Sequence, residues 1–159
     1  MVKKRTKKRK KKSGVVYFAV NNRIENMVKI GMTIDSVEER LKAANRKNEF
    51  MCGTWSITQK VKTNDVSRTE SLAHTLFDEH YDEDSVSTEM YFIPTKMTVK
   101  EMADNVREKD RIHVVQMEEQ EKAERVVLEA QKKLVELQKK HKGELKPEPP
   151  ESEPTDMVK

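Results

Sequence analysis

Short apolar runs and polar turns alternate along the first part of the chain, which is the pattern of a small mixed fold. Residues 15–20 are apolar throughout and predict a central strand. Residues 27–32 predict a second strand that forms a hairpin with the first. Residues 54–61 alternate apolar with polar side chains and predict a third strand, and residues 90–93 predict a short fourth run of strand.

Two amphipathic helices are predicted between these strands. Ser36 has the character of an N-cap, because two glutamates follow it in the first turn, and the helix is expected to end near Lys47. Asn64 or Asp65 caps the second helix, which is expected to end near Tyr81. Strands and helices in this order predict an α+β fold.

The pattern changes after residue 96. Residues 97–142 contain neither Pro nor Gly and predict one long helix that Gly143 ends. Four apolar residues at a/d spacing predict a short coiled coil in this helix, and with it a homo-oligomer formed through residues 97–142: Val127, Ala130, Leu134 and Leu137. Residues 143–159 combine prolines with acids and predict a disordered tail.

Composition limits the size of the folded part. Charged residues make up 38% of the 159 residues and hydrophobic residues only 35%, so one domain cannot fill the chain. We therefore expect four segments, which are a basic disordered arm, a folded domain, a long helix and a disordered tail, at residues 1–13, 14–95, 96–142 and 143–159. The formal net charge is +4, and subtracting the nine cations of the first twelve residues leaves −5 for the rest.

The basic arm is the clearest indication of a nucleic-acid partner. Its cations would release counterions on binding a polyanion and give a steep salt dependence, although they carry no base-reading information. Nine residues are predicted to bind nucleic acid: Lys3, Lys4, Arg5, Lys7, Lys8, Arg9, Lys10, Lys11 and Lys12. A nuclear localisation signal has the same composition, so both interpretations stay open.

Cysteine content and hydropathy bear on the compartment. Cys52 is the one cysteine, which excludes an intramolecular disulfide and a zinc site built on paired cysteines. We expect an intracellular, reducing compartment, with the nucleus or a virion as candidate locations. No run approaches the roughly 18–20 apolar residues of a membrane span, and no secretory signal is evident, so no membrane partner is expected.

Five short motifs follow one another along the folded part of the chain, and their order carries information about its family. They are Val15-Val16-Tyr17, Lys29-Ile30-Gly31-Met32-Thr33, Ser36-Val37-Glu38-Glu39-Arg40-Leu41, Glu70 with His74 and Phe77, and Glu89-Met90-Tyr91-Phe92. Together they resemble the GIY-YIG nuclease superfamily, and in particular its DNA-binding branch in phages, large DNA viruses and some fungal proteins. The resemblance covers residues 14–95.

The resemblance implies a fold and a chemistry. The fold would be a small antiparallel three-stranded sheet flanked by helices. A single divalent metal, Mg²⁺ or Mn²⁺, would be held chiefly by Glu70. Tyr17 would act as general base or position the attacking water, and Arg40 would stabilise the phosphate during cleavage.

The residues themselves are suited to phosphodiester chemistry. A guanidinium such as that of Arg40 matches phosphate oxygens bidentately, and a Mg²⁺ ion needs only one carboxylate besides waters and substrate. Lys29 stands where nucleases of the superfamily carry tyrosine. Lys29 either lowers the pKa of Tyr17, or contacts phosphate, or marks a domain that binds without cutting. His74 lies four residues after Glu70, as a surface neighbour or a second metal ligand.

These observations predict a DNA-binding protein first and a metal-dependent endonuclease second. The candidate catalytic residues are Tyr17, Lys29, Arg40, Glu70 and His74. Each has a plainer interpretation, such as a core position for Tyr17 and a solvated helix position for Arg40. The alternative function is a non-catalytic virion or assembly protein that binds nucleic acid through its arm and oligomerises through its helix. An RNA-binding accessory factor is a third alternative.

Overall fold

The computed structural model describes residues 11–50, 53–85 and 89–144. The chain divides into two compact units, Met1–Val114 and Val115–Lys159, and each is considered by itself. Its elements in chain order are β1 Gly14–Asn21, β2 Met27–Thr33, α1 Val37–Lys47, β3 Trp55–Thr63, α2 Val66–Leu76, the 3₁₀ helix η1 Asp78–His80, β4 Met90–Phe92 and α3 Val99–Glu144.

The sheet is antiparallel and has the strand order β3-β1-β2-β4. The apolar strand β1 is central, as its sequence predicts, and the α+β class is confirmed. The sheet has four strands and not the three that the family resemblance implied, because β4 adds to β2. The ladder between β4 and β2 covers only Met27–Lys29, and one further bond joins the Ile30 N–H to the Glu89 carbonyl. Beyond that bond, none of the described strands pairs with the outer edge of β2.

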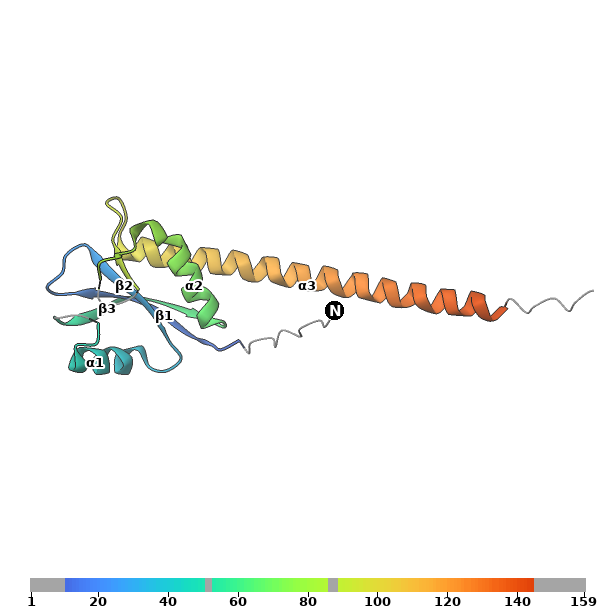
Figure 1. Cartoon of the computed structure of the whole chain (residues 1–159), viewed down its shortest axis with the longest axis horizontal. Coiled ribbons are helices and arrows are strands. Elements are labelled where there is room, and N and C mark those ends of the chain that lie inside the picture. Colours follow the sequence, from blue (N-terminus) through green and yellow to red (C-terminus); the bar gives the residue numbers. More distant parts are fainter. Residues whose placement is uncertain (1–10, 51–52, 86–88, 145–159) are drawn as a thin grey trace, which may run out of the picture. The chain divides into compact units, whose positions relative to one another are not determined.

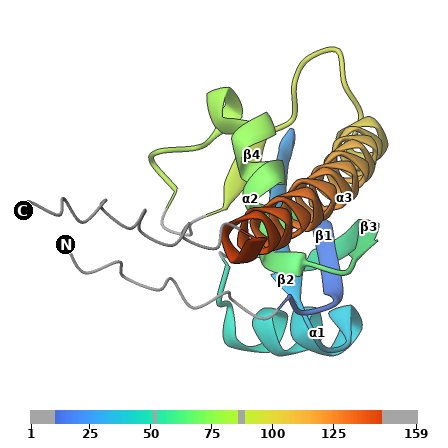
Figure 2. The ribbon, with the colours of Figure 1, turned by 90° about the vertical axis from the view of Figure 1, so that its right-hand side faces the viewer.

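Helices cover both faces of the sheet, with α1 on one face and α2 with the start of α3 on the other (Figure 1). Figure 2 shows the same separation of α1 from α2 in the perpendicular view. Because neighbouring residues of a strand point to opposite faces, β1 supplies both cores. Tyr17 and Ala19 pack with α1 and Phe50, whereas Val16 and Phe18 pack with α2 and α3.

Side-chain caps fix the starts of the helices. The Ser36 hydroxyl accepts the Glu39 N–H at 3.3 Å, and the Asp65 carboxylate accepts the Arg68 N–H at 3.4 Å, so Ser36 is confirmed as a cap and Asp65 is the cap of α2. The Val66 N–H, one of the unsatisfied donors at the start of α2, is taken by the Lys12 carbonyl at 2.9 Å. That bond holds the end of the basic arm against α2.

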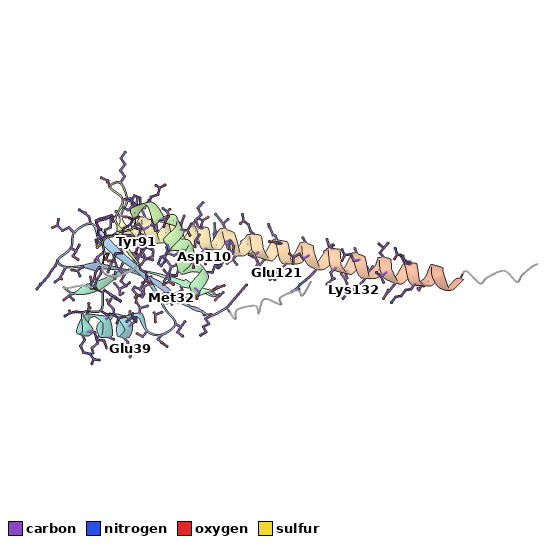
Figure 3. All side chains as sticks on the ribbon, viewed as in Figure 1. Met32, Glu39, Tyr91, Asp110, Glu121 and Lys132 are labelled. Atoms are coloured by element: carbon purple, nitrogen blue, oxygen red, sulfur yellow. The ribbon has the colours of Figure 1, made fainter. Side chains whose placement is uncertain are left out.

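The first turns of α3 belong to the core and not to a separate segment. Val99, Met102, Ala103 and Val106 are buried against the sheet, so the core extends past residue 95. Asp110, labelled in Figure 3, accepts hydrogen bonds from the buried Thr69 hydroxyl and from the Arg68 guanidinium, both at 2.7 Å. These contacts tie α3 to α2 within the first unit.

Some predicted boundaries differ from the structure. The helix expected to end near Tyr81 ends at Leu76, and η1 follows. Phe77 leaves helical geometry with φ −118° and ψ 17°, and the following turn is closed by the shorter bond from the His80 N–H to the Phe77 carbonyl. The long helix continues through Gly143 to Glu144, one residue past the expected stop. Residues 1–10 of the arm and 145–159 of the tail lie outside the described residues, as does Cys52.

The second unit consists, in its described part, of the later turns of α3. Every side chain of residues 115–140 is exposed, including Val127, Leu134 and Leu137. The coiled coil therefore stays a prediction. None of the described helices combines the length and apolar character needed to cross a membrane.

Candidate functional site

Five polar side chains lie close together where β1, β2, α1 and α2 meet. They are Tyr17, Lys29, Arg40, Glu70 and Glu89, which we call the site cluster. Four of them are predicted from the sequence as catalytic residues. Glu89 is only a weak candidate by sequence, and His74 lies elsewhere.

Tyr17 reaches the cluster through its contact with Gly31. The two residues are opposite each other in the β1–β2 ladder, and a Cβ atom at position 31 would lie 2.8 Å from the Tyr17 hydroxyl oxygen. The ring therefore lies directly on the glycine. Burial raises the pKa of Tyr17 to about 12, the Arg40 cation opposes this rise, and the nearby carboxylates, Glu89 first, add to it.

Lys29 is the buried cation of the cluster. Its ammonium donates to the Glu89 carboxylate at 2.7 Å and lies 4.4 Å from the centre of the Phe50 ring, and only 4% of its side chain is exposed. Burial is the main cause of the raised pKa of Tyr17, and the role of Lys29 toward Tyr17 stays a prediction. The contact of Lys29 that the structure shows is its ion pair with Glu89.

Glu89 is held in an unusual backbone conformation. Its φ of 75° lies in the left-handed region, which few residues other than glycine adopt. Its carbonyl accepts the Ile30 N–H at 3.0 Å, while its carboxylate binds Lys29. This conformation places a carboxylate beside Lys29, immediately before the start of β4.

Arg40 is the accessible cation of the cluster. Its guanidinium donates two hydrogen bonds to the Glu49 carboxylate, at 2.6 and 2.9 Å, and lies 5.2 Å from the Phe50 ring centre. The Arg40 side chain is 35% exposed, which contrasts with the buried Lys29. The ion pair raises the pKa of Arg40 and lowers that of Glu49.

Glu70 lies at the uncovered edge of β2. Its carboxylate accepts the N–H of Met32, which is one of the backbone donors that β4 leaves unpaired. Met32 is labelled in Figure 3. Burial raises the pKa of Glu70 to about 7; the Glu89 carboxylate adds to this rise and the Lys29 cation opposes it.

His74 continues the same contact one turn later in α2. Its Nε2 atom lies 3.4 Å from the Ile30 carbonyl oxygen, so the tautomer protonated at Nε2 donates to β2. Its ring packs against Tyr91 with centroids 5.6 Å apart. His74 therefore covers the strand edge, and the structure does not bring it into the site cluster.

The described carboxylates are suited to a hard cation but do not enclose one. No group of three histidine, cysteine, aspartate or glutamate side chains in the described part of the chain is placed to hold a metal. Glu70 and Glu89 repel each other, and a divalent cation would relieve that repulsion. Mg²⁺ is commonly held by one or two carboxylates together with water and substrate phosphate, so the donor set fits this ion.

Two members of the site were missed at the sequence level. Glu49 binds Arg40, and Phe50 lies beneath both cations of the site. Both residues follow the end of α1, where the sequence has no periodic pattern that would place them. Of the arm, Lys11 and Lys12 are described, and the cations from Lys3 to Lys10 lie outside the described residues.

Comparison with known protein families identifies the folded part of the chain. The family model of the T5orf172 domain matches residues 14–108, which span the sheet, α1, α2 and the buried turns of α3. No curated protein and no solved structure shows significant similarity to the chain.

Proposed function

The chain belongs to the T5orf172 domain family, and from that membership we propose that its folded domain binds the phosphodiester backbone of DNA at the site cluster. The observation that supports this most is the Arg40–Glu49 pair. Two oxygens of the Glu49 carboxylate occupy two guanidinium donors in a fork, which is the arrangement that two phosphate oxygens would take. Because both side chains are partly exposed, a phosphate can exchange with Glu49.

The GIY-YIG-like interpretation of the motifs belongs to the same proposal. Tyr17, Arg40 and Glu70 come from different elements, and Tyr17 lies within electrostatic reach of both Arg40 and Glu70, as a nuclease-derived site would require. A phenol with a pKa near 12 is ionised in only about one molecule in 10⁵ at neutral pH. Tyr17 is therefore a poor general base, which favours binding over cleavage as the main activity.

Arg40 and Glu49 should change DNA affinity in opposite directions. We expect Arg40→Ala to weaken binding of a short labelled duplex by about tenfold or more, since it removes a charge-assisted fork to phosphate. Glu49→Gln should strengthen binding by about two- to fivefold, because it removes the competitor of an exposed ion pair. Fluorescence anisotropy at fixed salt measures both.

Arg46→Ala is the matched control, because Arg46 is an exposed cation on the same helix and lies in its last turn. It should change affinity much less than Arg40→Ala. Equal losses from the two arginine variants, or a loss of affinity in Glu49→Gln, would contradict a phosphate contact at Arg40.

Metal-dependent cleavage of DNA is the second candidate function. It is favoured by the repulsion between Glu70 and Glu89, which a divalent cation at Glu70 would offset. When bound, such an ion would withdraw charge from a phosphate and activate water. Arg40 would orient the phosphate. Tyr17, which stays protonated, would donate a hydrogen bond and would not act as the general base.

The raised pKa of Glu70 predicts that Glu70→Gln changes the stability of the metal-free protein in a pH-dependent way. The raised pKa of Glu70 means that the folded state binds this proton more tightly, so the free energy of unfolding falls as pH rises from about 4.5 to about 7. At pH 8 the variant should be more stable than wild type by about 1–2 kcal/mol, a value that allows for solvent screening at the partly exposed Glu70 side chain. The difference should vanish by about pH 4, where the carboxyl group is protonated in both states. Thermal unfolding at several pH values measures this difference.

Mg²⁺ or Mn²⁺ should raise the melting temperature of wild type at pH 8 and leave Glu70→Gln unchanged, since the carboxylate is the expected ligand. Supercoiled DNA that wild type nicks with metal should stay intact with the variant. Equal metal-induced shifts in both proteins would remove Glu70 as the ligand. Failure of wild type to nick DNA would remove cleavage and leave the binding proposal standing.

A further inference from the structure

An open cavity of about 900 Å³ adjoins the site cluster and shares Arg40 with it. The cavity is bounded by the end of the basic arm, by the end of β2 and by the first turns of α2. Four of its lining residues are cations, Lys11, Lys12, Arg40 and Arg68, and one is an acid, Asp65. We call it the basic groove.

Backbone and side-chain contacts hold the cations of the groove in place. The Lys12 carbonyl is bonded to the Val66 N–H at 2.9 Å, which fixes the end of the arm at the start of α2. The Arg68 guanidinium is held by Asp110 at 2.7 Å and keeps 27% of its side chain exposed. Asp65 is occupied as the cap of α2, so its carboxylate is already engaged by the Arg68 N–H.

The remaining lining is suited to a sugar-phosphate strand. Ser67 and Ser71 place exposed hydroxyl groups on the α2 side, and Met32 with Ile34 gives the opposite side an apolar surface. Cations and hydroxyls bind phosphate oxygens, while the apolar surface accepts the carbon face of a deoxyribose.

We propose that the basic groove binds the DNA backbone next to the phosphate at Arg40, and so sets the direction in which the strand leaves the site cluster. The proposal rests on the proposed DNA binding. The site cluster and the adjoining Glu49 carry the charges of Glu49, Glu70 and Glu89 beside those of Lys29 and Arg40, so they offer little net attraction for DNA by themselves. The groove adds the cations Lys11, Lys12 and Arg68, whose charge is offset only in part by Asp65 and by the Asp110 partner of Arg68.

The position of the arm supports the same ligand. Lys11 and Lys12 line the groove, and seven further cations precede them in the sequence. A DNA strand in the groove would therefore contact Lys11 and Lys12, the residues through which the arm joins the domain. Cations before and after these two lysines would contact successive phosphates of one DNA backbone.

The test places one negative charge inside the groove and one outside it on the same helix. Ser71 lines the groove and Thr75 does not; both are exposed, and both hydroxyls donate to the carbonyl four residues earlier at 2.9 Å. In the full chain, Ser71→Glu should weaken binding of a labelled duplex by about fivefold or more through repulsion of phosphate. Thr75→Glu should leave affinity within about twofold of wild type.

Two further substitutions test the arm side of the groove. Lys11→Gln with Lys12→Gln should make the slope of log affinity against log salt shallower by about 1 for each lysine. Lys96→Gln with Lys100→Gln removes the same charge elsewhere in the domain and should leave the slope near that of wild type. Inorganic phosphate and anionic lipid vesicles serve as competitors, and an unlabelled duplex should displace the probe at far lower concentration than either.

The outcomes separate this inference from the proposal on which it rests. If wild type fails to bind the duplex, the proposed function itself is wrong. If wild type binds but Ser71→Glu and Thr75→Glu bind equally, the groove is wrong while DNA binding at Arg40 stands. Stronger competition by vesicles than by duplex would overturn DNA as the occupant.

Discussion

Removal of residues 1–10 should abolish most of the salt dependence of DNA binding. The deletion takes away seven of the nine arm cations and keeps Lys11 and Lys12 in the groove. Each cation that no longer neutralises a phosphate makes the slope of log affinity against log salt shallower by about 0.9, so the full change is up to about 6. Wild-type affinity should fall by about 10³ between roughly 50 and 200 mM salt, whereas the truncated chain should respond weakly.

Truncation at the other end provides the control. Residues 145–159 contain more acids than bases, so their removal should leave the slope unchanged or slightly steeper. Anisotropy titrations of the same duplex at several salt concentrations give all three slopes. A truncated arm that keeps the wild-type slope would show that these cations do not contact DNA.

Gly31→Ala should destabilise the protein clearly, although it adds only one methyl group. The new Cβ atom would lie 2.8 Å from the Tyr17 hydroxyl oxygen and 2.9 Å from the ring carbon that carries it. Tyr17 is only 2% exposed and is packed among core residues, so its ring cannot move aside. We expect the free energy of unfolding to fall by about 1–3 kcal/mol, the usual cost of overpacking. Denaturant titration measures the change.

A double-mutant cycle identifies the cause of that destabilisation. In a Tyr17→Leu background the ring is absent, so Gly31→Ala should cost much less than in wild type. Tyr17→Phe removes the hydroxyl but keeps the ring carbon at 2.9 Å, so relief in that background should be partial. An equal cost in every background would assign the effect to strand propensity and not to the close approach of ring and glycine.

The strands and helix caps were predictable because they depend on local patterns. An apolar run predicted the central position of β1, and Ser36 predicted the start of α1. The structure places Tyr17 within electrostatic reach of Arg40 and Glu70, three residues that the motif order linked, and their catalytic roles stay predictions. Each of them lies on a regular element, so spacing along the chain translates into position in space.

The partners of these residues were not predictable. Glu49 and Phe50 follow α1 in irregular backbone, and Lys29 meets Glu89 only because β4 pairs with β2 across sixty residues of sequence. The i,i+4 spacing predicts that His74 lies beside Glu70 on one face of α2, and the structure agrees. Their different contacts could not be predicted, because they depend on which backbone group of β2 lies below each residue. Glu70 accepts an N–H, whereas His74 faces a carbonyl.

The short length of β4 has a consequence for the solution behaviour of the protein. An exposed strand edge is a template on which another chain can add a strand and start aggregation. Here Glu70 and His74 occupy the Met32 and Ile30 backbone groups, so the edge of β2 is blocked by side chains. The carboxylate proposed to serve DNA chemistry therefore also blocks the addition of another strand at this edge. A substitution such as Glu70→Ala would unmask the edge, and a loss of activity in that variant would then be confounded with self-association.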